Sequence, residues 1–195
     1  MSELHSRTTR ILLAVLVLAI AGCHHRSELP ALFPVPDTAL VNETGQPVHL
    51  STLNGSVTVY DFIFTNCAGT CPMMTAAMRR LTKKVDKDLP VHFVSISVDP
   101  TRDTPAVLRQ YASRVRNDDR WMFLTGDRKA IIDLSVNGFK LAAGGTTLTA
   151  EDPLMHSSKF AIADKRGVIR EYYSATNDDA VDHVAGVVRD LARED

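Results

Sequence analysis

The sequence has no excess of positive charge. Its 22 lysines and arginines are offset by 23 aspartates and glutamates, so the formal net charge at pH 7 is -1. A protein that binds nucleic acid needs a basic patch or stripe that neutralises phosphates. We therefore exclude nucleic acid from the expected partners of this protein.

The sequence also lacks a hydrophobic run long enough for an ordinary membrane span. Its longest apolar stretch, from Ile11 to Ala21, has 11 residues. As a helix this stretch would rise only ~16 Å, whereas the hydrocarbon core of a bilayer is ~30 Å thick. A short apolar run that follows basic residues, here Arg7 and Arg10, is instead typical of a signal peptide.

Cysteine is scarce, with only three residues in the chain. The first, Cys23, follows the small residues Ala21 and Gly22 at the end of the apolar run. This pattern resembles the bacterial lipobox, in which cleavage leaves the cysteine as a new, lipidated N-terminus. We therefore expect residues 1–22 to be a lipoprotein signal peptide and Cys23 to carry lipid. The alternative is a plain secretory signal with a leftover cysteine.

A lipidated Cys23 would place the protein in the periplasm, anchored to a bacterial membrane. The next residue is His24 rather than aspartate, which by resemblance to sorting in enteric bacteria favours the outer membrane. Residues 23–39 contain Pro30, Pro34 and Pro36 and are expected to form an extended spacer after the lipid. Residues 40–195 then form one domain that is large enough for a sizeable core.

Apolar runs alternate with helical patterns along this domain. Short runs rich in β-branched and aromatic residues predict buried strands, and proline at the first helical position predicts helix starts. The pattern predicts strands at 57–64, 91–98 and 121–124, helices that begin near Pro72, Pro105, Ala130 and Asp178, and a hairpin of strands 159–163 and 168–173. Alternating strands and helices imply a parallel core sheet. With the closing hairpin and helix, they predict an α/β, thioredoxin-like fold with a mixed sheet and flanking helices.

The remaining cysteines, Cys67 and Cys71, form one pair in an oxidising compartment. They follow the first predicted strand and precede the first predicted helix, at the carboxyl edge where open α/β sheets place their ligands. A helix N-terminus offers unpaired N–H groups and a dipole that favours negative charge. We therefore expect at least one of the two thiols to have a lowered pKa.

The spacing of the pair leaves its chemistry open. Three residues separate the cysteines, whereas redox enzymes of this fold more often have two. Pro72 disfavours helical geometry at Cys71, so we expect the cysteines to flank a loop. Such a pair can form a disulfide or can hold a metal between two sulfurs. A purely structural disulfide is a further alternative, but closing so short a loop would stabilise the fold little.

A third ligand would distinguish a copper site from a bare redox pair, because thiolates favour Cu(I) and imidazole also suits copper. His156 lies just before the predicted strand 159–163. If that strand runs antiparallel to the first one, its start lies at the edge that carries the cysteines. This position alone leaves both a ligand role and a plain loop role open for His156. We expect His49 and His183 at the surface and His92 to be hydrogen-bonded within a strand.

At this point a set of motifs resembles the Sco/SenC family over roughly residues 40–191. The motifs occur in order as Phe64-Thr65-Asn66-Cys67, Cys71-Pro72, Ser95-Ile96-Ser97-Val98-Asp99-Pro100, Asp103-Thr104-Pro105, Leu124-Thr125-Gly126 and His156-Ser157. The resemblance implies a thioredoxin-like domain that binds Cu(I) or Cu(II) through two cysteines and a histidine. These ligands map onto Cys67, Cys71 and His156, and the same two cysteines map onto a redox-active disulfide.

The family assembles the dinuclear copper centre of cytochrome c oxidase, and its members are described as copper donors, thiol reductases or both. The resemblance therefore implies a copper-containing subunit of a respiratory oxidase, or another periplasmic copper protein, as partner. In one respect the chain differs from the family. Many members have proline and an acidic residue after the first cysteine, where this chain has Ala68 and Gly69.

The leading hypothesis is a copper-binding assembly factor that delivers copper to, or prepares the cysteines of, its client. The alternative is a periplasmic thiol-disulfide oxidoreductase that acts on protein cysteines, which would not need His156. A peroxidase of the same fold is a third possibility. The chain lacks the Pro-x-x-x-Thr-x-x-Cys pattern of such peroxidases before Cys67, which argues against it.

Overall fold

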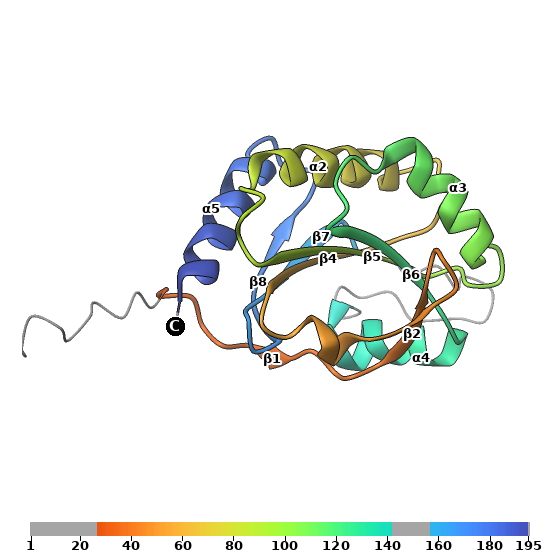
Figure 1. The fold of residues 1–195 in the computed structure, drawn as a ribbon, viewed down its shortest axis with the longest axis horizontal. Coiled ribbons are helices and arrows are strands. Elements are labelled where there is room, and N and C mark those ends of the chain that lie inside the picture. Colours follow the sequence, from red (N-terminus) through yellow and green to blue (C-terminus); the bar gives the residue numbers. More distant parts are fainter. Residues whose placement is uncertain (1–26, 142–156, 195) are drawn as a thin grey trace, which may run out of the picture.

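A mixed β-sheet forms the centre of the molecule (Figure 1). The computed structural model describes residues 27–141 and 157–194, and these contain one eight-stranded sheet. Its strands are β1 (Phe33–Pro34), β2 (Ala39–Asn42), β3 (Pro47–His49), β4 (Val57–Ile63), β5 (Val91–Ser97), β6 (Trp121–Thr125), β7 (Lys159–Ala163) and β8 (Val168–Ser174). The three predicted buried strands and the predicted hairpin are therefore present.

The sheet has the order β1-β8-β7-β4-β5-β6-β2-β3. Strands β4, β5 and β6 are parallel, whereas β7 pairs antiparallel with β4 and β8 pairs antiparallel with β7. This confirms the predicted mixed sheet with a parallel core and a closing hairpin. In the register of β4 and β7, Tyr60 lies opposite Ala161 and Thr58 opposite Ala163. The start of β7 therefore lies at the edge where β4 ends.

Helices cover both faces of the sheet. Figure 1 shows α2 (Cys71–Lys84), α3 (Pro105–Val115) and α5 (Ala180–Arg193) on one face and α4 (Arg128–Asp133) on the other. A π-helical turn (Leu134–Gly138) extends α4, and a 3-10 helix (Leu50–Leu53) precedes β4. Within the described residues, none of the helices has both the length and the hydrophobicity needed to cross a bilayer.

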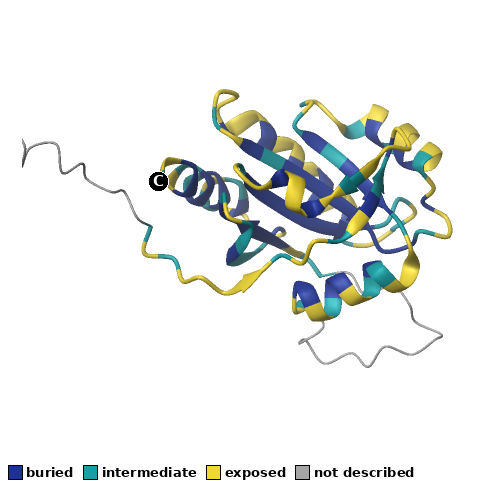
Figure 2. Cartoon of the chain, turned by 60° about the horizontal axis from the view of Figure 1, so that its bottom comes forward, coloured by how far each residue is buried: buried dark blue, intermediate teal, exposed yellow. Residues whose placement is uncertain are grey.

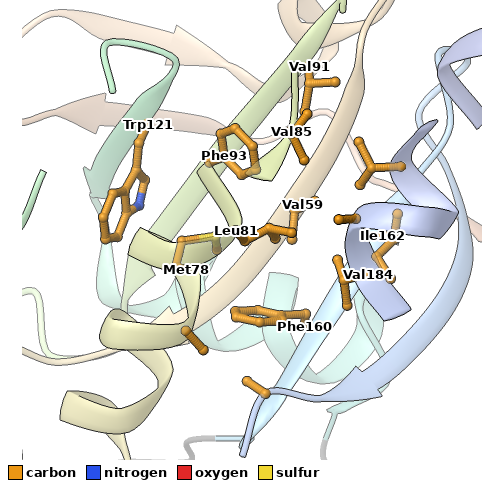
Figure 3. Close-up of a cluster of buried hydrophobic side chains, with 14 of the residues drawn as sticks. Val59, Met78, Leu81, Val85, Val91, Phe93, Trp121, Phe160, Ile162 and Val184 are labelled. Atoms are coloured by element: carbon orange, nitrogen blue, oxygen red, sulfur yellow. The ribbon is translucent and has the colours of Figure 1, made fainter. Parts of the chain in front are cut away.

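Two apolar cores follow from the alternation of side chains along the strands. On one face, Met78 and Leu81 of α2 lie over Val59 and Phe93 of the sheet (Figure 3). The side of α2 that faces the sheet is thus buried. On the other face, Tyr60, Phe62 and Ile96 pack with residues of α4 and its π-helical turn. The strands in the middle of the sheet are buried along most of their length, and the outer faces of the helices are exposed (Figure 2).

The described part of the predicted spacer, residues 27–39, packs against the domain. Phe33 of β1 pairs with Ile169 of β8. The buried guanidinium of Arg170 donates to the carbonyl oxygens of Pro30 at 3.1 Å and Leu29 at 2.5 Å. The structured domain therefore includes residues before 40, because backbone groups of this stretch find partners on β8. Strands β1, β2 and β3 were not predicted.

Candidate functional site

The two cysteines lie at the carboxyl edge of β4. Cys67 is half-buried in the loop between β4 and α2, and Cys71 is the first residue of α2 with 1% of its surface exposed. Both are free thiols in the structure. The pair flanks a loop, as expected, but the expectation that Pro72 keeps Cys71 out of helical geometry is wrong, because α2 begins at Cys71. Cys71 therefore belongs to the first helical turn, where backbone N–H groups have no partner within the helix.

Donors at the N-terminus of α2 and in the loop before it lie close to the sulfur of Cys67. The N–H of Gly69 donates to the Sγ of Cys67 at 3.4 Å. Partial burial raises the pKa of Cys67, but hydrogen bonds from the Cys71 thiol and from the N–H groups of Cys71, Gly69 and Thr70 outweigh it, so the net pKa is lowered. A thiolate at Cys67 is thus favoured by the helix N-terminus, which agrees with the expectation that at least one of the two thiols has a lowered pKa.

The second thiol has the opposite tendency. Burial raises the pKa of Cys71 to about 12, and the neighbouring Cys67 contributes further to the increase. The pair therefore ionises in two separate steps, with Cys67 losing its proton first. The less buried sulfur, that of Cys67, is the better nucleophile, and the sulfur of Cys71 stays protonated until a metal or a disulfide replaces its proton.

We predict that alkylation will separate the two thiols by pH. Because the thiolate is the reactive form, the lowered pKa of Cys67 should shift its rate midpoint with iodoacetamide below the ~8.5 of an unperturbed cysteine. Cys71 should react far more slowly over the same range, since burial raises its pKa. Peptide mapping by mass spectrometry measures both rates. A Cys67 midpoint at or above that of free cysteine would contradict the assignment.

A buried carboxylate holds the beginning of the cysteine loop in place. Asp103 is 1% exposed and accepts hydrogen bonds from the backbone N–H of Thr65 at 2.9 Å and from its hydroxyl at 2.5 Å. It also accepts from the hydroxyl of Ser97, at the end of β5, at 2.6 Å. The adjacent Thr104 caps α3. Asp103 therefore ties the loop to the neighbouring strand, a role that sequence reasoning missed.

A second carboxyl group, Asp61 of β4, lies within the core. It shares with Val59 and Ile63 the sheet face that α2 covers, and neither of its oxygens has a hydrogen-bond partner among the described residues. Burial raises the pKa of Asp61 to about 7, and the nearby Ser95 hydroxyl acts in the opposite direction. Its negative charge also raises the pKa of Cys71. Sequence reasoning missed this group too, although an aspartate inside the apolar run 57–64 is a signal for it.

Two predicted site residues, Cys23 and His156, lie outside the described residues. The antiparallel pairing of β7 with β4, on which the argument for His156 depends, is present. When the register is extended toward the start of β7, Ser157 comes opposite Phe64, three residues before Cys67. Within residues 27–141 and 157–194, no group of three or more histidine, cysteine, aspartate or glutamate side chains could hold a metal ion.

The other histidines of the described chain lie in different surroundings. His49 is exposed beside Asp37 at 3.3 Å. His183 is half-buried, contacts Glu171 at 2.8 Å and stacks on the ring of Tyr173. His92 was expected to be hydrogen-bonded, but its buried Nδ1 has no partner among the described residues, and burial lowers its pKa.

Comparison with known proteins gives one family. The family model SCO1/SenC matches residues 35–192. BsSco, described as a member of the Sco family of cytochrome c oxidase assembly proteins with a disulfide switch, is 32% identical and has a TM-score of 0.72. The match covers 84% of this chain and 95% of that chain.

Two further solved structures are similar. A SCO1/SenC family lipoprotein from Bacillus anthracis is 29% identical with a TM-score of 0.74, and the match covers 86% of this chain and 99% of that chain. Arabidopsis thaliana ScoI, solved with copper bound, is 25% identical with a TM-score of 0.65, over 78% of this chain and 94% of that chain. These matches agree with the thioredoxin-like fold that the sequence predicts.

Proposed function

This chain belongs to the SCO1/SenC family, and on that premise we propose that it is a copper-binding assembly factor for a respiratory oxidase. It delivers copper to, or prepares the cysteines of, the copper-containing subunit of that oxidase or another periplasmic copper protein. The observation that carries this proposal is the pair of free thiols, Cys67 and Cys71, at the N-terminus of α2. Two sulfurs at one sheet edge are a donor set that suits Cu(I).

We assign Cys67, Cys71 and His156 as the copper ligands. The described residues supply two sulfurs there, and no third cysteine, histidine or carboxylate joins them in a metal-binding group. His156 directly precedes Ser157, and the extended β4–β7 register brings Ser157 to the edge that carries the cysteines. A nitrogen donor beside two thiolates would allow the site to hold Cu(II) as well as Cu(I). Binding releases the proton of each thiol that becomes a ligand.

Adding Cu(II) to the reduced protein tests the function. We expect intense thiolate-to-copper charge-transfer bands and one copper per chain by metal analysis. The matched control is the same protein with the Cys67–Cys71 disulfide formed, which should give no such bands because its sulfurs are no longer thiolates. If the reduced protein gives no charge-transfer bands either, copper binding fails as the function and the thiol reductase becomes the leading hypothesis.

A thiol-disulfide oxidoreductase remains the second candidate, favoured by the unequal pKa values of the two thiols. In this reaction the Cys67 thiolate attacks a disulfide of the client protein, forms a mixed disulfide and displaces one client sulfur as a thiolate. Cys71 then loses its proton and attacks the sulfur of Cys67, which releases the second client thiolate. Two electrons pass to the client, and the Cys67–Cys71 disulfide remains.

We further propose that Cys23 is lipidated and anchors a domain that faces the periplasm. The similar lipoprotein from Bacillus anthracis supports this. Three residues separate Cys23 from Ser27, whose N–H donates to Glu194 at 2.7 Å. The four Cα-to-Cα steps from Cys23 to Ser27 reach at most ~14 Å. The anchored end of the domain would therefore stay close to the membrane surface.

The cysteine site lies at the other end of the sheet. Gly55, just before β4, donates to the carbonyl of Lys165, and Lys165 in turn contacts the backbone of Glu194. The amino end of β4 is thus near the anchor, and its carboxyl end, which carries Cys67, is about 23 Å further along the strand. With Cys23 as the lipid anchor, this arrangement would direct the site away from the membrane, toward a client domain in the periplasm.

A Cys23→Ser variant should lose its anchor. Serine cannot form the thioether, so we expect soluble protein in the periplasmic fraction or an unprocessed precursor. Fractionation followed by mass spectrometry of the N-terminal peptide measures both outcomes, and a Cys67→Ser variant, expected to stay with the membrane, is the control. Wild-type protein that retains an uncleaved, membrane-inserted segment 11–21 would refute lipidation.

A further inference from the structure

An apolar groove opens beside the cysteine pair, and the function described above makes no use of it. It lies between α2 and α3 and has a volume of about 310 Å³. Both helices lie on the same face of the sheet (Figure 1). The residues that matter for its chemistry are Cys67, Pro72, Ala76, Arg79, Tyr111 and Val115.

The groove follows α2 for two turns. Pro72, Ala76 and Arg79 are exposed and occur at helical spacing, so they form one stripe on the helix surface. Cys71 and Arg79 are eight residues apart, which corresponds to ~12 Å along the helix axis. The groove therefore runs from the thiols at one end to a guanidinium at the other.

The walls of the groove are fixed before any ligand binds. The hydroxyl groups of Tyr111 on α3 and Thr75 on α2 are hydrogen-bonded to each other at 2.8 Å. The Tyr111 ring packs edge-on against Phe123 of the sheet, with 5.7 Å between ring centroids. A preformed groove loses little conformational freedom on binding, so more of the contact energy appears as affinity.

The two helices that form the groove carry positive charge only. Together α2 and α3 contain six lysines and arginines and neither aspartate nor glutamate. This contrasts with the whole chain, whose formal net charge is -1. Arg79 itself makes no ion pair within the described residues, although it borders the groove. The groove is thus complementary to an apolar side chain that is accompanied by a carboxylate.

We propose that this groove docks an extended acidic segment of the client protein beside a client cysteine. An apolar side chain of the segment lies between α2 and α3, a carboxylate pairs with Arg79, and the cysteine meets Cys67. An extended chain covers ~12 Å in about four residues, so the carboxylate is three or four residues from the cysteine. This inference rests on the proposed function, because it names how that same site recognises its partner.

A peptide carrying an activated disulfide tests the docking. The probe is an acetylated peptide whose cysteine is joined to thionitrobenzoate, with leucine two residues and glutamate four residues after it. The reduced protein carries Cys23→Ser so that no third thiol reacts. The Cys67 thiolate attacks the peptide sulfur, a protein–peptide disulfide forms, and coloured thionitrobenzoate leaves with the electron pair of the broken bond.

We expect the rate to saturate with peptide concentration. Replacing the glutamate of the probe by lysine should slow the reaction at least about tenfold, the size of one charge-assisted contact. Replacing its leucine by glycine should also slow the reaction about tenfold, because the apolar side chain is no longer buried in the groove. An Arg79→Glu variant should reverse the preference for glutamate over lysine.

Arg80→Glu is the matched control, because Arg80 is the next exposed arginine of α2 and does not line the groove. It changes the net charge equally and should keep the preference for glutamate. The neutral reagent dithiodipyridine should react equally with all variants, which shows that the thiols themselves are unchanged. Equal rates for the glutamate and lysine probes, or equal effects of the two arginine variants, would overturn the docking proposal.

Copper binding distinguishes a failure of the groove proposal from a failure of the proposed copper function. The Arg79→Glu variant should keep the charge-transfer bands of the wild type, since Arg79 is no ligand. If the peptide preference is absent but the bands are present, the groove proposal fails and the copper function stands. If the bands are absent in the wild type while the peptide preference is present, the groove serves a thiol reductase instead.

Discussion

A His156→Ala variant is expected to lose at least ~100-fold in copper affinity, since even the hydrogen-bond partners of metal ligands are worth 10–100-fold. Two sulfurs alone leave the coordination shell incomplete, above all for Cu(II), which prefers nitrogen or oxygen donors beside thiolate. The variant should still form the Cys67–Cys71 disulfide. Competition titration with a copper chelator measures the affinity, and a melting curve verifies the fold.

Two further variants serve as controls for this result. Replacing both Cys67 and Cys71 by serine should abolish copper binding and redox activity together. His49→Ala removes an exposed histidine whose side chain contacts Asp37 at 3.3 Å, and it should leave copper affinity unchanged. If His156→Ala binds copper as tightly as the wild type, the ligand assignment is wrong. If it loses copper and still supports the client fully, copper delivery is not the function.

The second large effect is expected at Asp61, where an Asp61→Asn variant should reduce the pH dependence of stability. Burial raises the pKa of Asp61 from 3.8 to about 7. Between these values the folded chain holds a proton that the unfolded chain has released, so the free energy of unfolding falls as the pH rises. Below pH 3.8 the carboxyl is protonated in both states and its ionisation costs no stability. Above pH 7 the buried charge lowers the free energy of unfolding by about 4 kcal/mol.

Asparagine keeps the shape of the side chain but has no proton to lose. The stability of Asp61→Asn relative to the wild type should therefore increase by up to about 4 kcal/mol between pH 4 and pH 8. Urea titrations of both proteins at several pH values measure this difference. The pKa of Cys71 should fall in the same variant, because the Asp61 charge contributes to its increase.

Asp164 offers a control of opposite sign. Burial raises the pKa of Asp164, but hydrogen bonds from Val168, Arg166 and Arg170 lower it by a larger amount. The net pKa is therefore below the ordinary value. Its contribution to stability is present above 3.8, the ordinary pKa of an aspartate in an unfolded chain, and is lost as the pH falls. Asp164→Asn should thus destabilise the protein at neutral pH and less so in acid.

A pH profile of stability for Asp61→Asn that parallels the wild type would refute the buried charge at Asp61.

The sequence by itself determined the central strands, the helix starts and the place of the thiols. Apolar runs marked β4 and β5 over nearly their observed lengths. Pro72 and Pro105 marked the first turns of α2 and α3, because proline restricts its own φ angle and lacks the N–H that a helix start leaves unpaired. These signals are local, so they can be read without knowing which segments meet. The lowered pKa of one of the two thiols was expected from the same junction of strand and helix, and the structure assigns it to Cys67.

Only the tertiary structure decided which distant groups meet. Strands β1, β2 and β3 are short, and their pairing with β8 and β6 depends on backbone groups that carry no sequence signal. The carboxylate of Asp103 accepts a hydrogen bond from the backbone N–H of Thr65, which is 38 residues earlier in the chain. The groove beside Cys67 exists because α2 and α3 pack side by side with Tyr111 and Thr75 between them. Hydrogen bonds and burial depend on positions in space, and periodicity along one segment does not specify how far apart two segments will lie.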